Sequence, residues 1–147
     1  MSNVISFTVN CVPPSTTAQQ KGAFAMPGGG VRFFKKKKAV AAERTWFALL
    51  QPHAPSAPME GPVSLNVRLV YPWRKSEKKS VLRAFSAMPI ETRPDIENVF
   101  KMMGDVMTTL RFFNDDSQIA VLTIAKFYGD RPGIAVSMRP AIGCPRQ

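Results

Sequence analysis

The sequence predicts a small single domain of the α/β (α+β) class, residues 1–147, in which helices pack on a mixed β-sheet. Three observations lead to this fold class. The chain has 147 residues, about the length of one domain. Apolar and polar residues alternate in several segments, as in strands, and recur at helical spacing in others. A hydrophobic fraction of 45% is ordinary for a globular protein and excludes a largely disordered chain.

The first half of the chain is predicted to contain one strand and one helix. Alternation predicts a strand over residues 4–12, ended by a proline pair. Residues 15–30 are rich in Gly, Thr and Gln and indicate a loop. Within it, 26–30 lacks the pattern of a phosphate-binding loop and is typical of a hinge or hairpin tip. Helical spacing over 34–51 predicts a helix, and the proline-rich segment 52–62 is a linker.

The second half of the chain is predicted to contain most of the sheet. Residues 63–71 alternate regularly, which predicts a strand. The basic segment 74–87 follows and includes a short helix around 78–85. Residues 117–128 predict a long strand, and 134–138 are expected to be its hairpin partner.

A helix is also predicted to begin at Pro94, because proline favours the first turn. Its apolar stripe, at spacings i, i+3, i+4, i+7, i+11 and i+14, consists of Ile96, Val99, Phe100, Met103, Met107 and Leu110. Asn98, Lys101 and Asp105 share the opposite side, so their polar groups project together from one face.

The charge balance points to a polyanionic partner. The chain carries 20 Lys and Arg against 10 Asp and Glu, a net charge of +10 at pH 7. Such a surplus favours nucleic acid first and an anionic membrane second. A lysine run is also typical of a solvated face, so phosphate contact gains weight only beside a nucleic-acid site. The candidate DNA-binding residues are Arg32, Lys35, Lys36, Lys37, Lys38, Arg74, Lys75, Lys78 and Lys79.

Several function classes are disfavoured. Cys11, Cys144 and the single histidine, His53, cannot complete a four-ligand zinc site without a carboxylate, and their spacing matches no zinc motif. We expect two thiols rather than a disulfide, and no hydrolase chemistry based on His53, which lies in a proline-rich loop. No apolar run approaches the roughly 18 residues of a membrane helix, and no signal peptide is recognisable. We therefore expect a cytoplasmic protein with no membrane contact and no organic cofactor.

Acidic residues gather in one part of this basic chain. Five of the ten lie within the 22 residues from Asp95 to Asp116. Carboxylates repel DNA, so a nucleic-acid-binding protein that collects them is expected to hold a divalent cation, and hard oxygen ligands favour Mg²⁺ or Mn²⁺. The alternative is that Asp95 and Glu97 are ordinary first-turn helix residues, while Asp115 and Asp116 belong to a solvated turn. The residues alone leave both interpretations open.

The segment from Arg93 to Ile119 carries a specific pattern. It has the form Arg-Pro-Asp-Ile-Glu-Asn, followed by Lys101 and Asp105, and then Asn-Asp-Asp-Ser-Gln-Ile beginning at Asn114. This pattern resembles the RusA family of Holliday junction resolvases, which are found in bacteria and their phages. Shorter matches elsewhere are Val12-Pro13-Pro14-Ser15, Lys126-Phe127-Tyr128 and Pro132-Gly133.

The resemblance implies a homodimeric, Mg²⁺-dependent endonuclease that resolves four-way DNA junctions by paired symmetric nicks in recombination and repair. Mn²⁺ is an alternative cation. A two-fold dimer would present two equivalent sites to the two strands that are cut. The resemblance places metal-binding acids on Asp95, Glu97 and Asp116, with Asp115 beside them, and an essential catalytic lysine on Lys101. Asn98 and Asp105 are supporting polar positions.

This chain departs from the family pattern at Glu97, where aspartate is usual. The extra methylene moves the carboxylate about 1.5 Å outward, so metal affinity or activity can differ. Two other functions therefore stay open: a non-catalytic basic DNA- or RNA-binding protein, and a nuclease that cuts other branched DNA such as flaps and forks. Nicking of a four-way junction with and without Mg²⁺ tests for the non-catalytic alternative, and comparison of junctions with flaps and forks tests for the other nuclease.

Overall fold

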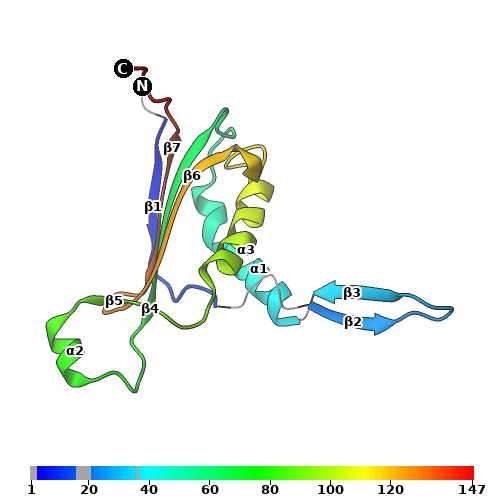
Figure 1. Cartoon of the computed structure of the whole chain (residues 1–147), viewed down its shortest axis with the longest axis horizontal. Coiled ribbons are helices and arrows are strands. Elements are labelled where there is room, and N and C mark those ends of the chain that lie inside the picture. The colour runs from blue at the N-terminus through cyan, green and yellow to red at the C-terminus, as the bar shows by residue number, and fades with distance from the viewer. Residues whose placement is uncertain (1–2, 16–20, 36) are drawn as a thin grey trace.

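The computed structural model describes residues 3–15, 21–35 and 37–147, and for 21–24 and 32–35 it describes the backbone alone. Its centre is a mixed five-stranded sheet with two long helices on one face, which confirms the predicted α+β class (Figure 1). Across the sheet the strands are β1 (Ile5–Val9), β7 (Gly133–Pro140), β4 (Val63–Pro72), β6 (Ile119–Gly129) and β5 (Ala87–Pro89). The helices on that face are α1 (Lys37–Leu50) and α3 (Ile96–Thr109).

The alternation of β4 decides which face of the sheet is covered. Its inward-facing residues are Val63, Leu65, Val67, Leu69 and Tyr71, all buried. The residues between them are polar or partly exposed, so one face of the strand packs on the helices. Large side chains from both helices and from the turn after α3 complete this core, including Trp46, Leu50, Met103, Met107 and Phe112.

The predicted hairpin between 117–128 and 134–138 is wrong. β4 pairs with β6 in parallel and with β7 antiparallel, so β4 lies between the two strands that were expected to be neighbours. The three-residue connection 130–132 crosses the end of β4, since three extended residues can span the ~10 Å of two strand spacings. Trp73 Nε1 donates to Asp130 Oδ1 at 2.8 Å and fixes this crossing. β7 then begins at Gly133, where a Cβ would lie 2.9 Å from the Val9 carbonyl oxygen.

The N-terminal third contains a hairpin of which the sequence predicts only the tip. β2 (Lys21–Ala25) pairs antiparallel with β3 (Val31–Lys35), so the loop expected over 15–30 and the helix start expected at 34 are both corrected. The alternation of apolar and polar residues is weak in β2 and β3. The strong helix formers that follow β3 made the predicted helix begin too early, at residue 34. The tip itself is confirmed: Gly28, Gly29 and Gly30 all have positive φ, which glycine adopts without strain. This hairpin arm, residues 21–35, extends away from the sheet (Figure 1).

A second projection lies between β4 and β5. It is the α2 arm, residues 73–86, which contains α2 (Lys79–Ala84), as predicted. β5 was missed because three residues are too few for a recognisable alternation. In Figure 1 the α2 arm and the hairpin arm project on opposite sides of the start of α3.

Three smaller expectations are also resolved. Cys11 and Cys144 are both free thiols, as predicted. His53 lies in the short 3₁₀-helix η1 (Gln51–His53), where its ring stacks on Phe7 with centroids 4.2 Å apart. Within the described part of the chain, no helix is long and apolar enough to cross a membrane.

Candidate active site

The beginning of α3 places the first pair of predicted acids. The helix α3 begins at Ile96, two residues after the start expected at Pro94, and Asp95 is its N-cap. Asp95 Oδ1 accepts hydrogen bonds from the backbone N–H groups of Glu97 (3.0 Å) and Asn98 (3.4 Å). Aspartate favours this position because its oxygen satisfies free N–H groups at the positive end of the helix dipole. Among the described residues, no group donates to Asp95 Oδ2, so this oxygen is available to a cation.

The outer side of α3 carries the other predicted polar residues. Lys101 lies one turn after Glu97, and Asp105 one turn after Lys101; all three are exposed. Asn98 is half-buried. The predicted apolar stripe packs on the sheet, although Met102 and Val106 are buried too, so the buried side of α3 is wider than the stripe.

The segment before α3 is held by Lys126, a residue that was not predicted to belong to the site. Lys126 Nζ donates to the carbonyl oxygens of Thr92 and of Pro94, the latter at 2.7 Å. The available signal was its position: Lys126 pairs with Leu69 and faces the helices, where a charged residue needs partners.

The second pair of predicted acids lies in the turn that follows α3. Asp115 caps the 3₁₀-helix η2 (Asp116–Gln118) and accepts a hydrogen bond from Ser117 N at 3.1 Å. Hydrogen bonds from the side chain and then the backbone of Ser117 hold the pKa of Asp115 below its usual value, so this carboxylate stays charged. Asp116 is exposed at the start of η2.

Gln118 fastens this turn to the protein and was also missed as a site residue. Its Oε1 accepts from Asn114 N (2.7 Å) and Asp115 N (3.0 Å). Its Nε2 donates to the carbonyl oxygens of Met59 and Gly61, both at 2.9 Å. One side chain thus holds the acidic turn against the loop before β4. The glutamine in the Asn-Asp-Asp-Ser-Gln-Ile pattern was the signal.

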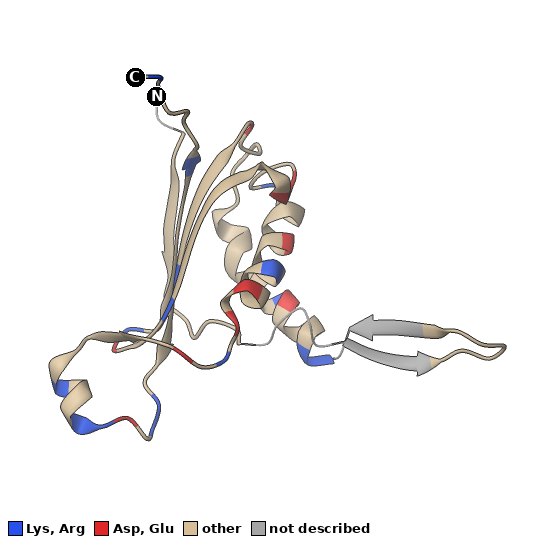
Figure 2. Ribbon diagram, viewed as in Figure 1, with Lys and Arg blue, Asp and Glu red and all other residues tan. Residues whose placement is uncertain are grey.

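The two acid pairs lie at opposite ends of α3. The helix has 14 residues and is therefore about 21 Å long. Asp95 and Glu97 lie near the carboxyl ends of the parallel strands β4 and β6, whereas Asp115 and Asp116 precede β6. Figure 2 shows acidic segments at the start of α3, along it and in the turn beyond it. Within residues 3–15, 21–35 and 37–147 of one chain, no three His, Cys, Asp or Glu side chains are placed to hold a metal ion.

Basic residues flank the start of α3 on two sides (Figure 2). Exposed on the α2 arm are Arg74, Lys75, Lys78 and Lys79. Arg74 is already engaged there, 3.1 Å from Glu77 and 5.0 Å from the centre of the Tyr128 ring. Lys37 and Lys38 are exposed at the start of α1, where the hairpin arm joins the body. Of the other candidates, Lys36 and the side chains of Arg32 and Lys35 lie outside the described part of the structure.

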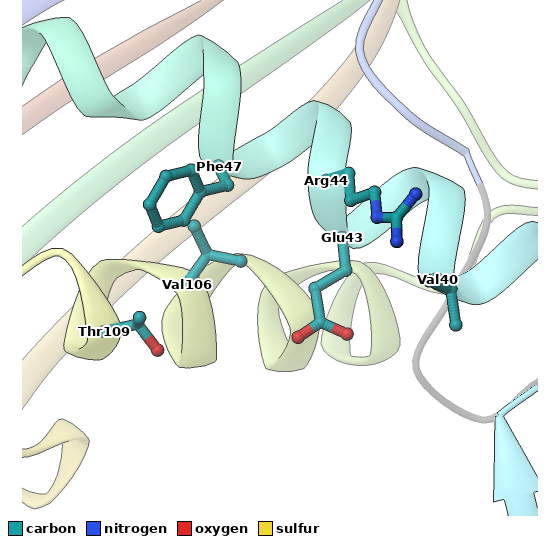
Figure 3. Close-up of a pocket in the computed structure, with 6 residues that line it drawn as sticks. All are labelled: Val40, Glu43, Arg44, Phe47, Val106 and Thr109. Atoms are coloured by element: carbon teal, nitrogen blue, oxygen red, sulfur yellow. The ribbon is translucent and has the colours of Figure 1, made fainter.

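Two pockets lie near these elements. The groove between α1 and α3 has a volume of about 260 Å³ and is lined by Val40, Glu43, Arg44, Phe47, Val106 and Thr109 (Figure 3). It includes none of the predicted site residues. A smaller pocket of about 140 Å³ lies between the α2 arm and β5 and includes Glu91 and Thr92, directly before the acid pair.

Comparison with known proteins fits this arrangement. The family model described as "Endodeoxyribonuclease RusA" matches residues 12–139, which include both acid pairs, Lys101 and Lys126. The chain belongs to the RusA family. A relative from Lactococcus phage r1t, named crossover junction endodeoxyribonuclease rusA, is 28% identical over 123 residues, covering 84% of this chain and 88% of its own length. The uncharacterized protein YqaN of Bacillus subtilis (strain 168) is 30% identical over 112 residues, covering 74% of this chain and 72% of its own.

Proposed function

We propose that this RusA-family protein is a homodimeric, Mg²⁺-dependent endodeoxyribonuclease that resolves four-way DNA junctions by paired symmetric nicks. The match to the RusA endodeoxyribonuclease model over most of the chain supports nuclease chemistry. The name of the phage relative supports the junction substrate. The net charge of +10 supports a nucleic-acid partner, and two such chains carry +20.

The separation of the two acid pairs along α3 is the observation that supports a homodimer. Asp95 and Glu97 lie at one end of a helix of about 21 Å, and Asp116 lies beyond the other end. A carboxylate ligand must be within about 2–2.5 Å of its metal ion, so these residues of one chain do not fit a shared site. Two chains whose α3 helices run antiparallel about a two-fold axis would bring each helix start to the partner's acidic turn.

In that pair, each site takes Asp95 and Glu97 from one chain and Asp116, with Asp115 beside it, from the other. All of the metal-binding atoms in this site would be carboxylate oxygens, which suit Mg²⁺ and also Mn²⁺. A cation bound there would act as a Lewis acid and lower the pKa of a bound water.

The remaining residues would bind and orient the DNA. Asp95 Oδ1 stays committed to the helix cap, which fixes the direction of its second oxygen. Lys101, exposed beside Glu97, would neutralise charge on the scissile phosphate or assist proton transfer. Lys37, Lys38 and the α2 arm would contact phosphates on either side.

The direct test is cleavage of a synthetic four-way junction with and without Mg²⁺, beside flap, fork and linear DNA. We expect symmetric nicks in the junction, lost on chelation of the metal. Cleavage confined to flaps or forks would favour the branched-DNA alternative. Binding of all these substrates without cleavage would favour the non-catalytic alternative, for which the Glu97 departure is the motivating feature.

A mixing experiment tests the composite site. Asp95→Asn and Asp116→Asn are each expected to bind junctions without nicking them. Mixed dimers of the two variants contain one site with both substitutions and one site with none, so refolding an equimolar mixture should restore nicking. If each site lay within one chain, every site in the mixture would be damaged and no activity would return.

A further inference from the structure

The segment that delivers the first acid pair, residues 90–95, links β5 to α3 and depends on one side chain. Lys126 Nζ donates to the carbonyl oxygens of Thr92 and Pro94, and its backbone oxygen accepts from Ile90 N at 3.2 Å. Residues 90–95 are all described, and within the described structure no other group donates to the Thr92 and Pro94 carbonyls. The path of the chain into α3 is therefore set by Lys126.

Lys126 itself is held firmly by the sheet. Lys126 lies in β6, which pairs with β4 over its length and with β5 at its end. Its neighbours on the same side of the strand, Ile124 and Tyr128, pack against the core. Lysine is flexible when free, but here two of the three ammonium donors are used and its backbone is held on both sides. A carbonyl oxygen also prefers a charged donor to a neutral one.

The segment 90–95 ends at Asp95, the N-cap of α3. Pro94, whose carbonyl Lys126 holds, is the residue before the N-cap. A shift of the Pro94 carbonyl would turn Asp95 away from the N–H groups of Glu97 and Asn98 and would redirect its second oxygen. Misplacement of a reacting group by about 1 Å can lower a rate by about 100-fold.

We propose that Lys126 is a positioning residue for cleavage: it ties strand β6 to the start of α3 and thereby orients Asp95 and Glu97. This inference rests on the nuclease function proposed above. It differs from the role of Lys101, because Lys126 acts through the two carbonyls and not on the DNA.

The test compares Lys126→Met, which keeps the length of the side chain and removes the donors, with Lys126→Arg, which restores a cation with several donors. Ile124→Ala is the matched control, since it removes core packing from the same side of β6 two residues away. Each variant is measured for junction affinity, for single-turnover nicking at saturating enzyme and Mg²⁺, and for amide hydrogen exchange at Glu97 and Asn98 without DNA or metal.

We expect Lys126→Met to bind junctions as the wild type does, to nick them about 100-fold more slowly, and to exchange the two amides faster. Lys126→Arg should recover most of the rate and protection. Ile124→Ala should lower the melting temperature but leave both readouts unchanged. A Lys126→Met variant with wild-type exchange at Glu97 and Asn98, or with a wild-type nicking rate, overturns the inference. Failure of the wild-type protein to nick junctions would instead refute the proposed function, and the exchange comparison would still decide the positioning role.

Discussion

Asp95 combines a structural and a chemical task in one carboxylate. One oxygen caps α3, and the other accepts no hydrogen bond within the described structure. The cap fixes the orientation of the carboxylate through Oδ1, and Oδ2 stays available to a ligand. Asparagine is an equally good N-cap, so Asp95→Asn separates the two tasks: the fold is retained and the charge is lost.

Glu97 lies where the motif resemblance implies aspartate, and its substitutions test whether it binds metal. Glu97→Asp should be tolerated or should raise the nicking rate, because a carboxylate is kept. Glu97→Gln should lower the rate by more than about 100-fold, since even indirect partners of a metal site cost about 10–100-fold when removed. Single-turnover nicking of a four-way junction measures both. Wild-type rates for both variants would identify Glu97 as a solvated first-turn acid.

The sequence predicted the candidate acids and Lys101 because their spacing forms a recognisable motif. It did not predict the residues that hold them. Lys126 contacts carbonyls 32 and 34 residues away, and Gln118 contacts carbonyls 57 and 59 residues away. Such contacts depend on the path of the chain, which local patterns do not encode. The local signs were a lysine on the inward side of a strand and the glutamine that follows the acid pair in the motif.

Among the elements, prediction succeeded where one periodicity runs over many residues. β4 and α3 are close to the expected ranges, since burial of one face imposes a clear pattern on each. It failed for β2 and β3, whose alternation is weak, for β5, which has only three residues, and for the partner of β7. Strand order depends on contacts between segments far apart in the sequence, and the alternation within 134–138 carries no information on its partner.

Gln118 makes the acidic turn a fixed element, and its removal should therefore destabilise the protein. Gln118→Leu leaves two N–H groups and two carbonyl oxygens without their partner, and we expect the free energy of unfolding to fall by about 1–3 kcal/mol. Urea denaturation measures this change. Gln51→Leu, at an exposed glutamine for which no side-chain hydrogen bond is seen in the described structure, is the control and should be nearly neutral. Equal effects of the two substitutions would contradict the proposed role of Gln118.

At the scale of the whole molecule, charge is distributed in a pattern that suits a DNA-cleaving protein. Acidic residues lie along α3, and exposed basic residues lie on the α2 arm and at the start of α1 (Figure 2). A polyanion can then be held from both sides while its backbone approaches the carboxylates. Net charge alone could indicate a nucleic-acid partner, but only the fold shows that the arms lie on either side of α3.

The lysines at the start of α1 should act in binding and not in chemistry. Replacing Lys37 and Lys38 by alanine should weaken junction binding and reduce the slope of log K against log salt by about 0.9 for each lost phosphate contact. Single-turnover nicking at saturating enzyme should change little. The control is Arg139→Ala with Arg146→Ala, which removes the same charge from exposed positions at the C-terminal end of the chain. A control with the same change in slope would mean that only net charge matters.

The length of α3 has a geometric consequence for the proposed dimer. If each site joins the start of one α3 to the turn beyond the other, the two sites are separated by roughly one helix length, about 21 Å. The helix would then act as a molecular ruler for the spacing between the two cuts. An added helical turn would increase the distance between the two incisions by about 5.4 Å and would leave the ligands of each site unchanged. The 14 residues of α3 would thus be matched to the distance between the two strands that a junction presents for cutting.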